Sequence, residues 1–551
     1  MRLRWKITLC VAAVLATGGY LASQYWYYLP GIIFSIKDPV GPNRPVAWTP
    51  GPAAVADAAQ ARPPNIILIV ADDLGYNDIT FNGGGVANGA VPTPHIDGIA
   101  KAGVNFSRGY ASHATCSPAR AAMMTGRFPT RFGFEFTPTG KFHSKISAWE
   151  DKRERIAPWP VVYHSELEQA YDGAAMEIPQ SEIMLPKLLR SKGYRTLGLG
   201  KWHLGDSPAS RPEARGFDEY LGFYGGGSLY LPKDDPNAVR DIGKHYPPEK
   251  FLWANLPFSV RFNGGSRFAP SKYMTDYLAE EAASAIAANK NRPFFLYVGF
   301  NAPHAPFQAL KSDYDSLSSI SDHRLRVYAA MIKALDRGVG TVLDAVRAQG
   351  IEDNTIVIFT SDNGGAGAAG LPDLNKPFRG WKATFFEGGI RAPLFLKWPA
   401  RIKPSVVSSG AAGHVDIFAT AAAAAGVAVP SDRKMDGVDL VAIAGGASFP
   451  DRALFWRSGD YSALLQGDLK IQRLKRPDKT WLFNLKDDPT EHRNLASTDG
   501  SALASMSRLL DTMNAEQVRP LWPSLIEAPV LIDKPFNGNY SVKDEYIYWA
   551  N

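Results

Sequence analysis

Residues 115–126 read Thr-Cys-Ser-Pro-Ala-Arg-Ala-Ala-Met-Met-Thr-Gly, the residue order of a short helix with clear ends. Pro118 suits the first turn, where its missing N–H leaves no bond unmade, and Gly126 suits the residue just after the last turn. Cys116 and Arg120 then point from the same side of the first turns. A thiol at a helix N-terminus lies in a field that favours anions. A lone cysteine is more often a buried core residue, so the rest of the chain must decide.

Four apolar runs of strand length each lead directly into polar residues. Continuous apolar runs of this kind are typical of strands buried on both faces of a parallel sheet. The four runs and the residues that follow them are Asn65–Ala71 with Asp72-Asp73, Arg195–Gly200 with Lys201-Trp202-His203, Phe294–Phe300 with Asn301-Ala302-Pro303-His304, and Thr355–Thr360 with Ser361-Asp362-Asn363. Open α/β sheets bind ligands at the carboxyl ends of their strands. We therefore expect these polar groups to share one site.

Of these groups, the carboxylates of Asp72 and Asp73 are the ones whose burial costs the most free energy. Two acidic side chains beside a buried strand repel each other and lose hydration unless a positive charge lies between them. A divalent cation is the expected solution, and an acidic surface turn is the alternative.

Helical patterns separate the strands. Apolar residues recur at helical spacing from Tyr328 to Val346, ahead of the Thr355 strand, and Met274–Ala288 precedes the Phe294 strand in the same way. Strand–helix alternation predicts an α/β domain with a mostly parallel sheet. From about Ala453 onward the pattern changes to short strand-like runs, among them Tyr461–Gln466 and Leu469–Leu474.

Two long segments, Thr137–Ile178 and Gly225–Ala269, show no clear periodicity and are predicted to be loops. Long loops in compact enzymes often bind substrate. Their aromatic side chains can either stack on sugar or aryl rings or pack within the protein; they include Trp149, Trp159, Tyr230 and Trp253.

Composition excludes some classes of function. The 551 residues include 60 basic and 54 acidic side chains, a net charge of +6 that is well mixed along the chain, so no nucleic-acid footprint is present. The length allows one large α/β domain with an appendage. Only two cysteines occur, and Cys10 lies in the N-terminal apolar segment, which leaves Cys116 without an internal disulfide partner.

The N-terminus has the pattern of an export signal. Three basic residues precede an uncharged stretch that ends only at Lys37, and Ile7–Tyr28 supplies the roughly 20 residues that span a bilayer. We expect a retained anchor, with a cleaved signal peptide as the alternative, and an exported, periplasmic or extracytoplasmic catalytic part. The predicted organisation is a signal anchor or signal peptide at residues 1–28 and a linker rich in Pro, Ala and Gly at residues 29–63.

The stretch Cys116-Ser117-Pro118-Ala119-Arg120, followed by Thr125-Gly126-Arg127, resembles the signature of the type I sulfatases, members of the alkaline phosphatase superfamily. Partner motifs in family order extend the resemblance over roughly residues 64 to 500. It implies a catalytic domain at residues 64–450 with a large mixed, mostly parallel sheet flanked by helices. A smaller α+β subdomain at residues 451–551, built on an antiparallel sheet, would follow.

The resemblance also implies a metal centre and a modified cysteine. One calcium ion, with magnesium as the alternative, would be held by Asp72, Asp73, Asp362 and Asn363 and would contact the modified Cys116. Hard oxygen donors suit these cations. A maturation enzyme would oxidise Cys116 to formylglycine, whose hydrate carries two hydroxyls. One attacks sulfur and displaces the alcohol; the other then loses its proton and expels sulfate, which a serine could not do.

The remaining matched positions receive their roles from the same resemblance. Lys201 and Lys382 would hold sulfate oxygens, Arg120 and His203 would orient the hydrate, and His304 would protonate the leaving oxygen. Lys382 ends the run Phe378-Arg379-Gly380-Trp381-Lys382, which is like the family's Arg-Gly-x-Lys. Taken alone, each has an ordinary structural explanation, such as a surface lysine or a histidine that caps a strand.

The expected function is an arylsulfatase-like enzyme that hydrolyses an aryl or carbohydrate sulfate ester. Its partners would be a sulfated small molecule or saccharide, the maturation enzyme and the membrane, but no nucleic acid. Three alternatives remain: a phosphonate monoester hydrolase or phosphodiesterase of the same superfamily, an anchored binding protein without catalysis, and a phosphatase with two zinc ions.

Overall fold

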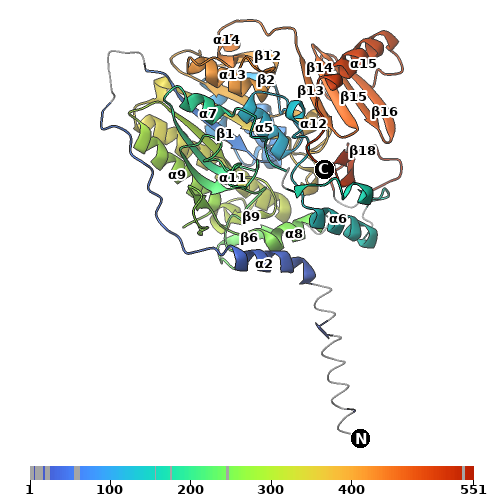
Figure 1. Ribbon diagram of the computed structural model, residues 1–551, viewed down its shortest axis with the longest axis horizontal. Helices are drawn as coiled ribbons and strands as arrows, with labels where there is room; N and C mark the ends of the chain where they lie inside the picture. Colours follow the sequence, from blue (N-terminus) through green and yellow to red (C-terminus); the bar gives the residue numbers. More distant parts are fainter. Residues whose placement is uncertain are drawn as a thin grey trace.

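The computed structural model describes residues 5, 17–18, 25–54, 62–154, 157–173, 176–242, 247–536 and 540–551. Most of the predicted membrane anchor, together with Cys10, lies outside these residues. Within the described ranges, no helix combines the length and the apolar character needed to cross a membrane. The first described helix of the body, α2 (Leu29–Lys37), contacts α8 (Pro247–Asn255) at the periphery of the molecule (Figure 1).

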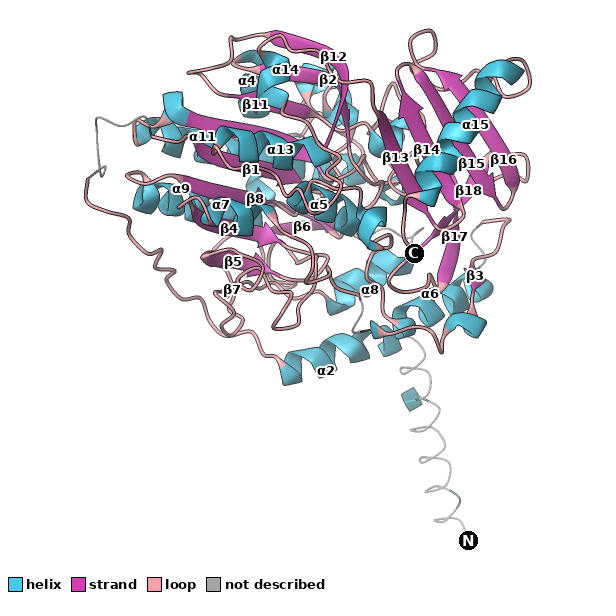
Figure 2. Ribbon diagram, turned by 45° about the horizontal axis from the view of Figure 1, so that its top comes forward, coloured by secondary structure: helices cyan, strands magenta, loops and turns pink. Residues whose placement is uncertain are grey.

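A mixed, mostly parallel sheet forms the centre of the molecule (Figure 2). Among the described residues it has nine strands in the order β12 (Val406–Gly413), β2 (Val104–Tyr110), β11 (Leu394–Lys397), β10 (Thr355–Ser361), β1 (Asn65–Ala71), β8 (Phe294–Gly299), β4 (Arg195–Lys201), β5 (Glu219–Phe223) and β7 (Arg261–Phe262). The strands β10, β1, β8, β4 and β5 run parallel to one another, whereas β11 and β7 are antiparallel to their neighbours. This confirms the predicted fold class.

Strand β1 shows why its sequence is continuously apolar. Every residue of β1 is buried, and successive side chains enter opposite layers of the core. Ile67 and Ile69 pack in the layer with α4 (Pro94–Lys101), α9 (Met274–Asn289) and α11 (His323–Ala348). Leu68 and Val70 pack in the layer with α5 (Cys116–Thr125), α7 (Leu185–Arg190) and α13 (Val415–Ala424). Helices therefore cover both faces of the sheet.

A second sheet follows the first along the chain. Its strands β13 (Ala453–Ser458), β14 (Tyr461–Gln466), β15 (Leu469–Lys475) and β16 (Asp478–Asn484) are antiparallel, and α15 (Gly500–Ala515) contacts β14 and β15. The expected C-terminal antiparallel sheet with a helix is confirmed. A buried ion-pair group joins this sheet to the main body, because Lys470 lies 2.8 Å from Glu387 and 2.9 Å from Glu491.

The two segments predicted to be loops contain regular elements. Residues 137–178 hold α6 (Lys141–Glu154) and β3 (Val162–Tyr163), and residues 225–269 hold β6 (Ala238–Asp241), α8 and β7. The buried positions of α6 include Ser144 and Ala148, small side chains that create no apolar period. The shorter remaining helices are α3 (Val86–Gly89), α10 (Lys311–Asp315), α12 (Glu387–Ile390) and α14 (Leu440–Ala444).

The aromatic residues of these segments divide into core and surface groups. Tyr230 and Trp253 are buried, with 0% and 6% exposure, so they pack within the protein. Trp159 stacks on Tyr546, with ring centroids 4.1 Å apart, and Trp149 is exposed.

The end of the chain returns to the α6 segment. Strand β17 (Ile526–Leu531) pairs with β18 (Tyr546–Ala550) and also with β3. The remaining pair joins β6 to β9 (Phe307–Leu310). Segments that are far apart in sequence, α6, α8 and β17, thereby gather beside the carboxyl edge of the main sheet (Figure 2).

Candidate active site

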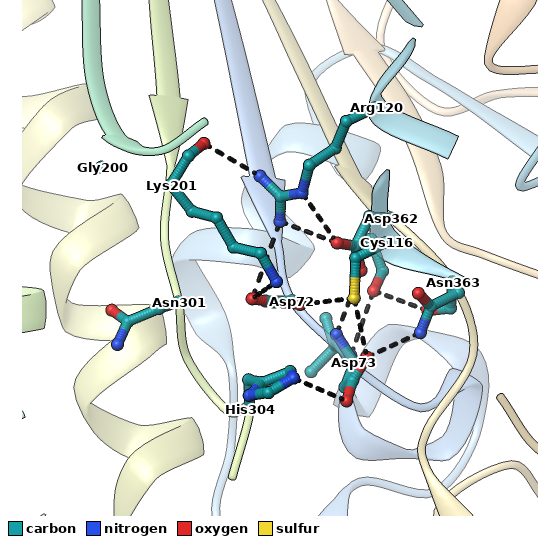
Figure 3. A network of polar contacts seen from close by, with 12 residues as sticks. Asp72, Asp73, Cys116, Arg120, Gly200, Lys201, Asn301, His304, Asp362 and Asn363 are labelled. Atoms are coloured by element: carbon teal, nitrogen blue, oxygen red, sulfur yellow. Dashed lines mark hydrogen bonds and ion pairs between the residues drawn. The ribbon is translucent and has the colours of Figure 1, made fainter. Parts of the chain in front are cut away.

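The predicted site residues meet at the carboxyl ends of four adjacent parallel strands. Because Ala71 and Ser361 are register partners, Asp72 and Asp73 emerge from β1 beside Asp362 and Asn363 from β10. On the other side of β1, Lys201 is the last residue of β4, and His304 follows β8 (Figure 3). The expectation that these polar groups share one place is confirmed.

Cys116 enters the site from helix α5. Thr115 precedes the helix in an extended conformation, and Gly126 ends it with a φ of 68°, as its sequence indicates. The thiol is 3% exposed. Its Sγ lies 3.5 Å from Asp72 Oδ1 and 3.8 Å from Asp73 Oδ1. The helix N-terminus therefore places the cysteine directly against the two acidic residues.

The surroundings of the Cys116 thiol favour its protonated form. Burial raises the pKa of Cys116, and the nearby Asp362 carboxylate raises it further, while Lys201 and Lys382 oppose the shift. The net pKa lies well above the ordinary value for cysteine. Burial and the carboxylates therefore act on the unmodified thiol against the anion-favouring field expected at the helix N-terminus.

Three carboxylates and three cationic side chains neutralise one another at the bottom of the site, which is called its floor below. The ion pairs are Asp72 with Lys201 at 2.6 Å, Asp73 with Lys382 at 2.7 Å, and Asp362 with Arg120 at 2.7 Å. Lys382 Nζ also donates to Cys116 Sγ at 3.0 Å. Buried charges are tolerated when they are paired in this way.

Burial alone would raise the pKa of all three carboxyl groups, but their partners differ. For Asp72, burial and then the Asp362 charge keep the pKa above its ordinary value. For Asp73, burial is the largest effect, but Lys382, His304 and Lys201 together outweigh it and the pKa falls. For Asp362, Arg120, Lys201 and Lys382 together outweigh burial and hold the pKa far below the ordinary value. Asp73 and Asp362 are therefore ionised at neutral pH.

The donor set fits a divalent cation. Ligand atoms of Asp72, Asp73, Cys116 and His304 lie within 4.8 Å of one another. Asn363 Nδ2 donates to Asp73 Oδ1 at 2.8 Å, and its Oδ1 is buried without a hydrogen-bond partner among the described residues. An unpartnered buried amide oxygen beside carboxylates is a suitable ligand for calcium or magnesium.

Arg120 is held behind the carboxylates by its hydrogen bonds. Its Nε donates to Asp362 Oδ2 at 2.9 Å, and its NH1 donates to the Lys201 carbonyl at 3.2 Å (Figure 3). The same NH1 donates to the Tyr297 hydroxyl at 2.6 Å. Tyr297 in turn donates to the Lys201 carbonyl at 3.1 Å. Tyr297 was not predicted to belong to the site. Its only signal in the sequence is a hydroxyl group within the otherwise apolar run of β8.

His203 has an unusual backbone conformation. Its φ is 61°, and the Ser117 hydroxyl donates to its carbonyl oxygen. A Cβ added at Gly226 would lie 2.9 Å from the imidazole, so the glycine makes room for the ring. Burial and then Lys201 lower the pKa of His203, which keeps the ring neutral. Ser117, the residue after the cysteine, thus helps to hold this histidine.

His304 has one nitrogen fixed and one available. Nδ1 lies 2.6 Å from the Ala305 carbonyl oxygen, which can only accept a hydrogen bond. Nδ1 therefore carries a proton, and Nε2, 3.7 Å from Asp73 Oδ2, carries one only in the imidazolium form. Burial lowers the pKa of His304, and the Asp72 and Asp73 charges oppose this.

A cavity of about 630 Å³ opens above these groups. Cys116, His203, His304 and Lys382 all line it. Its size lies within the usual range of about 300–1,000 Å³ for small-molecule sites. The polar cluster is therefore accessible to a substrate from one side.

Residues 64–427 match the family model described as Sulfatase. The chain belongs to the sulfatase family. Among curated sulfatases, the N-acetylgalactosamine-6-sulfatase of Canis lupus familiaris is 33% identical over 421 residues, 74% of this chain and 71% of that protein. Arylsulfatase A of Bos taurus is 30% identical over 496 residues, 81% of this chain and 86% of that protein.

A solved structure shares the fold. The structure of Ps i-CgsB in complex with k-i-k-neocarrahexaose has a TM-score of 0.68 and 32% sequence identity, and the match covers 84% of this chain and 95% of that chain. The family membership makes this sulfatase a sulfuric ester hydrolase. Sulfatases of this family typically use a metal ion and a formylglycine, and Cys116 lies next to the acidic cluster that such an ion would need.

Proposed function

We propose that the chain hydrolyses a sulfate monoester of an aryl or sugar alcohol with a formylglycine formed from Cys116 and one calcium ion, magnesium being the alternative. The observation that carries the proposal is the position of Cys116. It lies at the N-terminus of α5, against Asp72 and Asp73, and beside Lys382 on the wall of an open cavity.

Asp72, Asp73, Asp362 and Asn363 would hold the cation, which when bound would neutralise negative charge on the sulfate group. The charges support this proposal. Three carboxylates and three cationic side chains cancel in the ion pairs described above. A divalent cation leaves the site with a positive charge, which suits the single negative charge of a sulfate ester.

The side chains around the cation divide the remaining work. Lys201 and Lys382 carry the ammonium groups proposed to hold sulfate oxygens. Arg120, which Asp362 and Tyr297 fix, acts as a positioning residue for the carboxylates. His203, with its buried and unpartnered Nδ1 among the described atoms, is proposed to orient a hydroxyl of the formylglycine hydrate.

The relatives support sulfated substrates of more than one kind. One relative is named for N-acetylgalactosamine 6-sulfate, another is an arylsulfatase, and a solved relative is in complex with k-i-k-neocarrahexaose. Sulfated saccharides and aryl sulfates are accordingly both proposed as substrate classes for this site.

Comparison of two esters tests the reaction. Protein coexpressed with a formylglycine-generating enzyme is expected to hydrolyse 4-nitrophenyl sulfate with a higher kcat/KM than 4-nitrophenyl phenylphosphonate. Both esters carry one negative charge, but the phosphonate replaces one oxygen with carbon. A lysine left without its acceptor costs about 1–3 kcal/mol, equal to about 5-fold to 150-fold in rate. A preference for the phosphonate would support the phosphonate monoester hydrolase instead.

His304 is proposed to protonate the leaving oxygen, and His304→Ala tests this role. We expect a loss of about 10²–10⁴-fold for esters of weakly acidic phenols and a much smaller loss for 4-nitrophenyl sulfate, whose leaving group departs readily as an anion. In the parent enzyme, rates with poor leaving groups should fall as pH rises through the His304 pKa. Rates are measured across aryl sulfates of increasing phenol pKa.

His323→Ala is the matched control for loss of an imidazole. His323 contacts the Tyr314 hydroxyl at 2.9 Å and does not line the cavity, so its removal should leave the dependence on leaving-group pKa unchanged. An equal loss across the whole series for His304→Ala would mean that this residue shapes the site and that another group supplies the proton.

A further inference from the structure

The walls of the active-site cavity differ in character from its floor. Helix α8 and the residue after it contribute Phe251, Leu252 and Leu256. Strand β17 contributes Ile526, Ala528 and Val530, which alternate along the strand and therefore share one face. Two segments that are far apart in the sequence thus present hydrocarbon to the group that is attached to the sulfate.

The charges on the walls are acidic. Among the lining residues that the structure describes, Lys382 in the floor is the only lysine, and no arginine occurs. Glu150 and Asp151 from α6 supply carboxylates. His143 packs its ring on Phe251, with centroids 5.0 Å apart, and burial lowers its pKa, so it adds no cation at neutral pH. A second anionic group on the substrate would meet these carboxylates and, among the described lining residues, no lysine or arginine other than Lys382.

Part of this wall comes from residues beyond the match to the family model. The family match ends at residue 427, whereas β17 and Trp549 come from the last 26 residues, 526–551. Strand β3 of the α6 segment pairs with β17, with Tyr163 opposite Ile526. The contact between these two segments shapes the upper part of the cavity.

We infer that, of the two proposed substrate classes, the site prefers a sulfate monoester of a bulky, uncharged and largely apolar alcohol, such as an alkyl-substituted phenol or a polycyclic alcohol, over a sulfated saccharide chain. This rests on the proposed sulfatase reaction and specifies the alcohol. The physical basis has two parts. Apolar walls make binding more favourable for each substrate methylene that they remove from water. The hydrocarbon side chains themselves offer sugar hydroxyls no hydrogen bond, and the carboxylates of Glu150 and Asp151 oppose additional sulfate or carboxylate groups.

A series of 4-alkylphenyl sulfates, from methyl to butyl, tests the apolar wall. The alkyl group hardly changes the acidity of the phenol, so the chemical step stays constant along the series. Because one buried methylene is worth roughly a threefold to fourfold change in binding, we expect kcat/KM to rise about threefold per added carbon, chiefly through KM. A flat series would overturn the inference.

A second comparison tests charge. The butyl compound is matched with 3-(4-sulfooxyphenyl)propanoate, which has a similar length and a similar leaving group but ends in a carboxylate. We expect the propanoate and a monosulfated disaccharide to have lower kcat/KM than the butyl compound. Faster hydrolysis of either would overturn the inference and leave the sulfatase reaction intact.

Leu252→Asn links the effect to the wall. This near-isosteric change places an amide on the α8 side of the cavity and should flatten the alkyl series. Leu521→Asn is the matched control, since Leu521 is 38% exposed and does not line the cavity, and it should keep the parent slope. The same slope in both variants would contradict the assignment of the wall.

The same assays distinguish failure of the reaction from failure of the inference. Mass spectrometry establishes whether residue 116 carries the formylglycine. If the modified and folded protein released sulfate from none of these esters, the proposed function would fall, and the inference with it. Sulfate release from phenyl sulfate without a gain along the alkyl series would remove only the inference.

Discussion

Cys116→Ser is expected to lower steady-state sulfate release by about 10⁴-fold or more, the scale seen when a catalytic nucleophile is removed. A serine hydroxyl can accept the sulfuryl group from the ester, but it has no second hydroxyl whose deprotonation would expel sulfate. The variant should therefore accumulate a stable protein–sulfate ester. Intact-protein mass spectrometry after incubation with substrate measures that adduct, and sulfate assays measure the lost turnover.

Folding does not confound this experiment. Serine has nearly the size of cysteine, and a hydroxyl can accept the hydrogen bond that Lys382 donates to Sγ at 3.0 Å. Cys10→Ser, which changes the other cysteine of the chain, is the matched control and should retain full turnover. Complete activity in a preparation whose Cys116 is shown to be an unmodified thiol would sink the proposed nucleophile.

Asp362→Asn is expected to remove bound metal and activity together. The Asp362 side chain is fully buried and accepts from Arg120 Nε and from the Asp73 backbone N–H. The amide preserves the shape but removes the charge that both Arg120 and a divalent cation require. Breaking a buried ion pair by removal of one partner costs about 3–5 kcal/mol, so the free energy of unfolding should also fall. Elemental analysis, kcat and urea unfolding are the measurements.

Asp416→Asn separates the loss of a buried charge from the loss of a ligand. Asp416 is likewise fully buried and pairs with Arg452 at 2.6 Å, but it lies outside the cavity. We expect a comparable loss of stability with metal content and kcat retained in the folded protein. If Asp362→Asn instead kept one metal ion per chain and the parent kcat, Asp362 would not be a ligand.

Much of the site was predictable because its signals are local in the sequence. A continuous apolar run such as Asn65–Ala71 indicates a strand buried on both faces, and the polar residues that follow it must then lie at the strand end. The same reasoning placed Lys201, His304 and Asp362 correctly at one edge of the sheet. Likewise Pro118 and Gly126 marked the ends of the helix that carries Cys116.

Other features had no local signal. Helix α6 buries small side chains such as Ser144, so its sequence shows no apolar period. Strand β3 has two residues and pairs with a strand that lies far away along the chain, with Tyr163 opposite Ile526. The support that Tyr297 gives to Arg120 depends on the packing of β8 against α5. None of these contacts follows from spacing in the sequence.

By itself, the sequence determined which chemical groups the site contains: carboxylates, lysines and histidines at strand ends and a cysteine at a helix N-terminus. Only the tertiary structure decided which cation neutralises which carboxylate, that burial and the carboxylates together raise the pKa of the thiol, and that the cavity walls are apolar and acidic. The physical reason is the range of the interactions. Apolar periodicity and helix-end preferences act over a few residues, whereas ion pairing, desolvation and cavity shape arise between segments that only folding brings together.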